Sequence, residues 1–438
     1  MNPELTNDLP FPQAMEQEAT APAPPHEPMA PVAPSERIDV IDILRGLALF
    51  GILTANMRAF AAPFELYGNI NRMFTANIDW IAQAFVNTAF QGKFVTLFSF
   101  LFGLGFAVQM TRAEERGRSV SFYPRRLFFL LLIGLFHAWI IWPGDILIGY
   151  ALCGFLLFLF RKRSQKTIAI WALSLFAVFP LLFTGFYIAG FFGVGLPGGP
   201  GDPQKLNLAI QHAISVYRDG SWFSRVQLNF QEWKQSYSGP SPIFLMLFVL
   251  PRFLTGLWIW RSGLLKNPTQ YLPLVKKVAL WGFATGLVMD AIVLYIRFII
   301  DPPNGKMTGA AYIMTMARDI SLPAIAAFYA ASVMLLVQSV KWRSIVAPFG
   351  AIGRMALTNY LLQSLICTTF FHYTKLYGKM GPAVGLIPTV ILFGLQIPFS
   401  VWWLKNYQFG PAEWLWRSLT YGKMQPMRKQ AAYMQAAA

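Results

Sequence analysis

The stretch IDILRGLALFGILTANMRAF, residues 41–60, indicates the fold most directly. An α-helix of this length, at about 1.5 Å per residue, spans the roughly 30 Å hydrocarbon core of a bilayer. The rest of the chain has the same character, because 55% of its 438 residues are hydrophobic and only 13% are charged. Ordinary soluble domains carry about 25% charged residues. The composition therefore predicts a polytopic membrane protein.

Ten predominantly apolar segments are long enough, or nearly so, to cross a bilayer. They predict an all-α integral membrane protein, with about ten transmembrane helices in one bundle that occupies residues 37–424. The stretch 78–91 alternates apolar and polar residues at helical spacing, and we expect it to lie in the membrane interface. The ten segments are 41–60, 92–111, 124–142, 146–161, 167–193, 243–261, 275–299, 311–337, 346–372 and 383–405.

Basic residues are concentrated in alternate loops, and this gives the bundle an orientation. Five arginines lie between the end of the second segment and the first residues of the third, whereas the loop at 143–145 has no basic residue. The positive-inside rule then puts both termini in the cytoplasm of a multi-pass protein, which we expect in the bacterial inner membrane. The long segment 194–242 would face outward.

The two ends of the chain differ from the apolar middle. Residues 1–36 contain nine prolines and six acidic residues, which predicts a disordered tail. Residues 425–438 are predicted to form a cytoplasmic tail. Two cysteines, Cys153 and Cys367, both inside apolar runs, exclude a secreted disulfide scaffold. The net charge of +16 lies in short clusters between apolar runs, so we expect a lipid bilayer and no nucleic acid as partner.

Charged side chains in hydrocarbon cost about 2.5–3.5 kcal/mol each, so each one requires a partner or a function. Asp42 and Arg45 lie one helical turn apart, either as a structural ion pair or with the arginine presented to a phosphate or carboxylate. Asn56, further along the same helix, has interhelical hydrogen bonding as its simpler explanation. For Lys93, near a membrane boundary, the simpler explanation is a side chain that snorkels to the surface.

The string GLFHAWIIWPGD, residues 134–145, contains the most suggestive pair of residues. His137 can accept and return a proton near neutral pH, and Asp145 follows a Pro-Gly turn from which it can orient the imidazole. Alternatively, His137 is a hydrogen-bonded core residue and Asp145 caps the next helix. The four histidines have no metal-ligand spacing such as H-E-x-x-H, so no metal site is expected.

Polar residues also interrupt the apolar segments of the second half. Asp290 and Arg318 lie deep in two different segments, and the simplest prediction is that they neutralise each other across helices. Asn359 and Gln363 share a helix face at a spacing of four residues. Such a polar stripe either joins helices or lines a wet cavity.

Several strings together resemble the bacterial YeiB family, which is domain-of-unknown-function family 418. The resemblance covers about residues 37–424. The strings that carry it are RIDVIDILRG (37–46), KFVTLFSFLFGLG (93–105), HAWIIWPGDIL (137–147), GRMALTNYLLQS (353–364) and GPAEWLWRSLTYG (410–422).

The first helix is also similar to those of transmembrane acyltransferases of the acyltransferase-3 and heparan-glucosaminide acetyltransferase groups. Those enzymes carry an acyl group from cytoplasmic acyl-CoA to an acceptor, often a sugar, on the far side of the membrane. The similarity implies that Arg45, beside Asp42, together with Arg125 and Arg126, holds the phosphates of the donor. The acceptor would be an envelope glycan or a lipid-linked molecule, and no bound cofactor is expected.

In an acyltransferase, catalytic roles would fall to residues of this chain. His137, oriented by Asp145, would deprotonate the acceptor, while Lys93 or Asn56 would stabilise the carbonyl oxygen. The acyltransferase-3 group has a histidine late in its first helix, and the nearest residue here is Asn56, so the base would come from another helix. This hypothesis requires that His137 and Arg45 open into a common space that water or substrate can enter.

Two other functions fit the sequence. In a transporter or flippase, intramembrane polar residues would line a path, and Pro180 and Pro323 offer candidate helix breaks. In a non-catalytic scaffold, no wet cavity would join His137 to Arg45. The residues that would line the transport path are Asp290, Arg318, Asp319, Asn359 and Gln363.

Overall fold

The structure, a computed structural model, describes residues 39–66, 73–117, 119–192, 203–264, 270–300 and 308–429. The tail predicted to be disordered, 1–36, lies outside these residues, as does the end of the C-terminal tail at 430–438. Within the described ranges the regular elements are helices, and one isolated antiparallel bridge joins Tyr407 to Arg428. The predicted all-α class is therefore confirmed.

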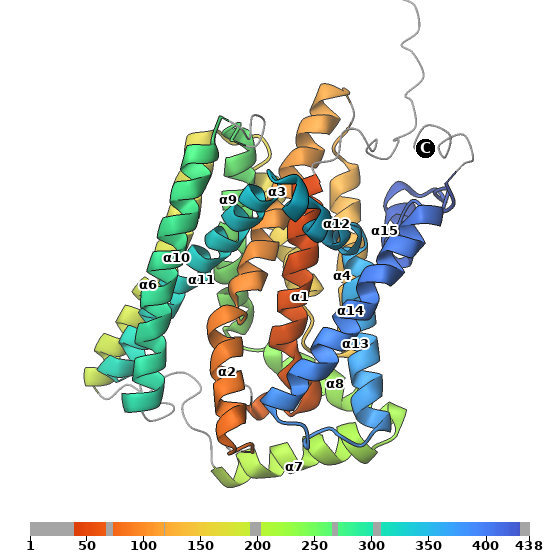
Figure 1. The fold of residues 1–438 in the computed structure, drawn as a ribbon. Helices are drawn as coiled ribbons and strands as arrows, with labels where there is room; N and C mark the ends of the chain where they lie inside the picture. The colour runs from red at the N-terminus through yellow and green to blue at the C-terminus, as the bar shows by residue number, and fades with distance from the viewer. Residues whose placement is uncertain are drawn as a thin grey trace, which may run out of the picture. The chain divides into compact units, whose positions relative to one another are not determined.

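Most of the helices are long and apolar enough to cross a bilayer (Figure 1). The described part of the chain contains eight such segments, or nine if one bent pair is counted as a span. The eight are α1 (Asp39–Ala61), α2 with α3 (Asn77–Ala89 and Lys93–Glu115), α4 with the π-helical turn η4 (Phe122–Phe136 and His137–Ile141), α6 (Gln165–Phe191), α9 (Ser241–Arg261), α10 with η5 (Leu272–Tyr295 and Ile296–Ile300), α11 (Gly309–Leu336) and α14 (Pro382–Asn406).

Two of the predicted segments have a different form. The helix α5 (Leu147–Leu159) has 13 residues, fewer than the roughly 20 that a straight span requires. The predicted span 346–372 is divided into α12 (Val340–Arg354) and α13 (Ala356–Tyr373), which meet at an angle of 80°. The bend allows α12 to pack directly on α1, because a Cβ atom at Gly353 would lie only 1.8 Å from the carbonyl oxygen of Asp42.

The helix α2 covers most of the stretch 78–91, for which a helix in the membrane interface is expected. Together with α3 it forms one apolar stretch, Asn77–Glu115, that is interrupted only by the turn at 90–92 (Figure 1). Gly92 has φ +77°, a left-handed conformation that favours glycine because a side chain would be strained there. α2 thus continues in the direction of α3, and its place in the membrane interface stays a prediction.

The remaining helices lie at the two ends of the bundle. The predicted outward segment contains α7 (Pro203–Asp219) and α8 (Trp222–Ser236), and α7 lies across one end of the bundle (Figure 1). The short 3₁₀ turn η2 (Phe64–Leu66) contacts α7, whereas α15 (Pro411–Tyr421) lies at the opposite end. We call these the α7 end and the α15 end.

The core is built around α1, which is buried over most of its length and packs on α3, α12, α13 and α14. Glycines bring the core helices together: a Cβ atom at Gly103 of α3 would lie 2.0 Å from the carbonyl oxygen of Phe253 in α9. At the periphery, α6 and α10 expose large apolar side chains such as Leu173 and Trp281. A bilayer would cover these apolar faces, as the composition predicts.

Candidate functional site

His137 and Asp145 form a buried pair at the α7 end of α4. His137 begins the π-helical turn η4, and its Nδ1 lies 2.8 Å from Oδ2 of Asp145. The other carboxylate oxygen accepts a hydrogen bond from the backbone N–H of Ile148 at 2.8 Å, which fixes the carboxylate. Gly134, one turn before His137, makes the approach possible, because a Cβ atom there would lie 3.1 Å from Oδ1 of Asp145. The predicted base and its orienting residue therefore lie together.

Aromatic side chains enclose the imidazole. The ring of Tyr360 lies 5.1 Å from that of His137, and the ring of Trp142 lies 6.4 Å away and packs on Phe60 at 4.3 Å. The side chains of His137 and Asp145 are both 0% exposed, and Nε2 of His137 is buried with no hydrogen-bond partner among the described residues. The expectation that His137 opens into a space shared with Arg45 is therefore not met in this conformation.

Asn56 lies on the side of α1 that faces this enclosure. It precedes Phe60 by four residues, so the two side chains share a helix face, and Phe60 contacts Trp142. The Asn56 side chain is half-buried. Its position is thus one helical turn from the aromatic wall around His137.

Arginines gather at the α15 end. Arg126 at the start of α4 stacks on Trp416 of α15 at 3.7 Å, and the charges of Arg417 and Arg45 act on it. Arg125 lies beside Gly422, where a Cβ atom would be 3.1 Å from its guanidinium nitrogens. Three elements, α1, α4 and α15, thus bring these cations together. We call Arg45, Arg125, Arg126 and Arg417 the arginine cluster.

Arg45 also has a local partner. Its Nη1 lies 3.0 Å from Oδ1 of Asp42, and the side chains are 30% and 15% exposed. The ion pair predicted for Asp42 and Arg45 is therefore present. The same guanidinium reaches α3, because a Cβ atom at Gly105 would lie 2.8 Å from Nη2.

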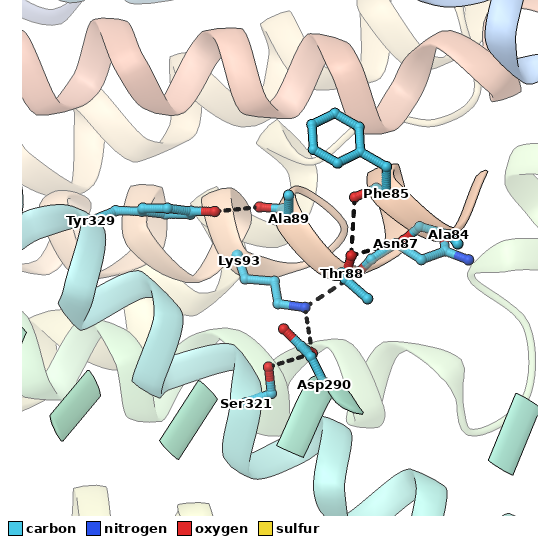
Figure 2. Close-up of polar contacts among 9 residues, drawn as sticks. All are labelled: Ala84, Phe85, Asn87, Thr88, Ala89, Lys93, Asp290, Ser321 and Tyr329. Atoms are coloured by element: carbon cyan, nitrogen blue, oxygen red, sulfur yellow. Dashed lines mark hydrogen bonds and ion pairs between the residues drawn. The ribbon is translucent and has the colours of Figure 1, made fainter. Parts of the chain in front are cut away.

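Lys93 is buried at the break between α2 and α3 (Figure 2). Its Nζ donates to Oδ1 of Asp290 at 3.0 Å and to the backbone oxygen of Asn87 at 3.3 Å. Asp290 also accepts a hydrogen bond from Ser321 at 2.7 Å, and Tyr329 donates to the backbone oxygen of Ala89 at 2.8 Å (Figure 2). The side chains thus satisfy backbone oxygens that the break leaves without helical partners.

These contacts correct two predictions about charge. Lys93 is 1% exposed, so it does not snorkel to the surface. Asp290 has Lys93 as its ion-pair partner, where the sequence predicts Arg318. Arg318 has an exposed side chain, and its charge acts on Lys93. Among the described residues, the hydrogen-bond partners of Lys93 are distinct from the residues that pair with His137 or pack on its ring, so the two groups belong to different parts of the bundle.

The polar stripe on α13 joins helices. Nδ2 of Asn359 donates to Ser400 of α14 at 3.0 Å, and Gln363 donates to Gln396 at 2.8 Å. Gln396 in turn donates to the backbone oxygen of Asn359 at 3.1 Å. All four side chains are buried. Of the two interpretations of this stripe, the geometry favours interhelical hydrogen bonding.

Arg252 is a buried charge that the sequence reasoning missed. It is 3% exposed in the middle of α9, its Nε donates to Thr96 of α3 at 3.0 Å, and its guanidinium lies over the ring of Phe248 at 3.6 Å. Asp319 of α11 supplies opposite charge. The sequence does mark this residue: an arginine inside an apolar segment is costly in hydrocarbon, so its position alone predicts a partner or a function.

Glu413 was also missed, although it lies in one of the strings that carry the family resemblance. One carboxylate oxygen accepts from the backbone N–H groups of Leu357 and Thr358 at 2.6 and 3.1 Å, and the other accepts from the Thr358 hydroxyl at 2.5 Å. Glu413 therefore caps α13 directly after the 80° bend. A contact between positions about 55 residues apart leaves no local pattern in the sequence.

A second acidic residue, Glu232, lies between α7 and α8, outside the membrane-spanning segments. Tyr217 of α7 donates to Glu232 of α8 at 2.9 Å and to Asn229 at 2.9 Å. Burial raises the pKa of Glu232 to about 8, and the negative charge of Glu65 in η2 acts in the same direction, while the Tyr217 hydroxyl opposes it. Glu232 is therefore protonated at neutral pH.

The fold and these buried charges define the class: this is a multi-pass membrane protein with a helical-bundle fold. The family model described as "Protein of unknown function (DUF418)" matches residues 259–423. The uncharacterized protein YxaH of Bacillus subtilis is 36% identical over 414 residues, which covers 90% of this chain and 97% of YxaH. The uncharacterized protein YeiB of Escherichia coli is 29% identical over 393 residues, covering 88% and 96%. The chain belongs to the DUF418, or YeiB, family.

Proposed function

We propose that this protein is a membrane acyltransferase that moves an acyl group from cytoplasmic acyl-CoA to an envelope acceptor, a sugar or a lipid-linked molecule. The observation that carries the proposal is the geometry of His137. Its Nδ1 is held 2.8 Å from Asp145, while Nε2 has no hydrogen-bond partner in the part of the chain that the structure describes. This arrangement suits a general base, because one nitrogen is oriented by a carboxylate and the other is left for the proton.

His137 can carry the proton through the whole transfer step. Nε2 of His137 takes the proton from the acceptor hydroxyl or amine as the acceptor atom attacks the thioester carbon. The bond between that carbon and sulfur then breaks, and the thiolate of CoA leaves and takes the proton from the imidazolium. Asn56, one turn from the aromatic wall, is the candidate to donate a hydrogen bond to the carbonyl oxygen as charge develops there. Access to Nε2 requires movement of Trp142 or Tyr360.

The arginine cluster supports the donor side of the proposal. Guanidinium groups suit phosphates because they form paired, charge-assisted hydrogen bonds. Arg126 and His137 lie on the same helix, eleven residues apart, which corresponds to about 16 Å along the axis. A donor held by its phosphates at the cluster would therefore have to extend along α4 toward the pair.

The proposed topology completes this scheme. Ten spans follow if α5 and the bent α12–α13 pair each count as one crossing. Both termini and the α15 end then face the cytoplasm, and α7 and α8 face outward, in the bacterial inner membrane. Fusion of a reporter to residues near 220 and near 425 would test this orientation in cells.

Transfer of label from acetyl-CoA tests the function. Membrane vesicles that contain the protein would receive radiolabelled acetyl-CoA, and label would be counted in the glycan and lipid fractions. We expect His137→Gln and Asp145→Asn to abolish the protein-dependent signal, whereas His372→Gln retains it, because His372 contacts the backbone of Tyr217 outside the pair. Full activity of a folded His137→Gln protein would remove His137 from the mechanism.

A transporter is the second candidate, and the break between α2 and α3 favours it. Discontinuous helices with buried charges form the substrate and ion sites of many secondary transporters. Lys93, Asp290 and Ser321 lie at this break (Figure 2). Proteoliposomes loaded with a pH-sensitive dye would show proton movement that Asp290→Asn abolishes and His137→Gln does not change.

A further inference from the structure

Helix α8 contacts the π-helical turn that carries His137. Nδ2 of Asn229 donates to the backbone oxygen of Trp139 at 3.3 Å, and Trp139 lies two residues after His137 in η4. The ring of Trp139 also packs on Phe230 and Trp233 of α8. Helix α8 therefore holds η4 by a hydrogen bond to its backbone and by aromatic contacts.

The hydroxyl of Tyr217 in α7 lies between two acceptors on α8. Its oxygen is 2.9 Å from Oδ1 of Asn229 and 2.9 Å from Oε2 of Glu232. The orientation of the Asn229 amide is fixed, because its Nδ2 is the atom that donates to Trp139. A tyrosine hydroxyl has one hydrogen, so it can donate to only one of the two oxygens. Both contacts are hydrogen bonds only when Glu232 carries a proton and donates it to the Tyr217 oxygen.

The groups around Glu232 favour that proton. Burial raises the pKa of Glu232 to about 8, and the negative charge of Glu65 in η2 adds to this effect while the Tyr217 hydroxyl opposes it. Tyr377, in the segment after α13, interacts electrostatically with Glu232, and His372 of α13 contacts the backbone oxygen of Tyr217. Burial and the neighbouring Glu232 raise the pKa of Tyr217 above 10, so Tyr217 keeps its proton when Glu232 loses its own.

We propose that Asn229 is a positioning residue for His137, and that the proton on Glu232 determines whether Asn229 holds η4. With the proton present, Glu232 donates to Tyr217 and Tyr217 donates to Asn229. The Asn229 amide is then satisfied on both sides and holds η4 at Trp139. When Glu232 ionises, its carboxylate becomes the stronger acceptor and takes the Tyr217 hydrogen. Oδ1 of Asn229, whose side chain is 3% exposed, loses its donor, and this weakens the contact of the amide with η4.

This relay regulates the site of the proposed function, and it rests on that function only in that His137 acts as the base. His137 begins η4, whereas the Asp145 carboxylate is fixed separately by the backbone N–H of Ile148. A shift of η4 therefore moves the imidazole away from the carboxylate that orients it. Because α7 and α8 belong to the α7 end, the pH on that side of the membrane controls the site (Figure 1).

Hydrogen–deuterium exchange of the purified full-length protein tests the relay without requiring activity. Exchange of the amides at 138–142 would be followed by mass spectrometry at about pH 6 and about pH 9, on either side of the Glu232 pKa of about 8. Glu232→Gln is the reference at each pH, because its amide donates to Tyr217 at both values while chemical exchange itself accelerates with pH. We expect equal rates at the lower pH. At the higher pH the wild type should exchange about tenfold faster, as expected for one buried acceptor left without a donor.

Two further variants separate the relay from general effects of charge. Asp219→Asn removes a carboxylate at the same end that pairs with Arg218 and is 53% exposed, so it should exchange like the wild type at both pH values. Tyr217→Phe removes the hydroxyl between Glu232 and Asn229, so it should exchange faster than Glu232→Gln at both pH values. In the label-transfer assay, the wild type should lose activity as the pH rises through about 8, and Glu232→Gln should not.

Equal exchange of the wild type and Glu232→Gln at the higher pH would overturn the inference, as would loss of the response in Asp219→Asn. Label transfer with the same pH profile in the wild type and Glu232→Gln would also overturn it, and would leave the acyltransferase proposal intact. If the exchange response is present but the wild type transfers no label, the acyltransferase proposal fails and the relay is retained.

Discussion

Removing one member of the Lys93–Asp290 pair should destabilise the protein strongly, whereas removing both charges should not. In Lys93→Met, the hydrogen bond from Ser321 is what the Asp290 carboxylate keeps among the described residues, although its side chain is just 11% exposed. A buried charge left without its partner costs about 3–5 kcal/mol, and we expect a loss of this size in the free energy of unfolding. Asp290→Asn leaves the Lys93 ammonium with the backbone oxygen of Asn87 and should cost about 3 kcal/mol.

The double variant separates charge from packing. Methionine fills the space of the lysine side chain, and asparagine still accepts the hydrogen bond from Ser321, so neither buried charge remains. We expect Lys93→Met with Asp290→Asn to lie within about 1 kcal/mol of the wild type, because replacing a whole buried pair is often neutral.

The assay is unfolding of the purified protein by sodium dodecyl sulfate in mixed micelles, followed by tryptophan fluorescence. Arg343→Gln is the control: it breaks an ion pair with Asp39 in which the side chains are 62% and 68% exposed, so it should cost well under about 1 kcal/mol. If the losses in the double variant were additive, or if Lys93→Met lost no stability, the two charges would not stabilise each other in the folded protein.

Three further predictions concern other features and use the same unfolding assay. Glu413→Ala should cost about 2–4 kcal/mol, because two backbone N–H groups at the start of α13 lose their acceptor, and Glu413→Gln should cost less. Gly353→Ala should cost about 1–3 kcal/mol by overpacking α1 against α12, whereas Gly394→Ala, in open space, should be neutral or stabilising. Since the pKa of Glu232 is raised from 4.5 to about 8, the folded state binds the extra proton between these values and stability should fall as pH rises from about 4.5 to 8. Glu232→Gln should remove that slope, and an unchanged slope would contradict the assignment.

Eight of the ten predicted segments coincide with apolar helices of the described chain that are long enough to span a bilayer, because hydrophobicity summed over a whole span is a strong signal. The same averaging hides short interruptions. The bend at Met355 and the break at 90–92 occupy one to three residues inside apolar runs, so no window of span length resolves them. The bend depends on the close contact of Gly353 with α1, and that contact is a tertiary feature.

Ion pairs between residues close in sequence could be predicted, whereas pairs between distant residues could not. Asp42 with Arg45 and His137 with Asp145 were predictable because each pair is close in sequence. Lys93 and Asp290 are 197 residues apart, and the choice between Lys93 and Arg318 depends on which face of α3 meets α10 and α11. Periodicity gives the faces of each helix but does not say which helices are neighbours.

The buried polar residues form two sets in different parts of the bundle, one around His137 and the other around Lys93. His137 and the arginine cluster lie at opposite ends of α4, so a substrate that reaches both must follow this helix through the bundle. Lys93 lies instead on the side of α3 that meets α10 and α11, and those two helices pack mainly against each other. In a transport cycle α10 and α11 would have to move relative to α3, whereas acyl transfer requires α4 to stay in place. Variants of His137 and of Asp290 should therefore separate the two functions, because each set is held by its own helices.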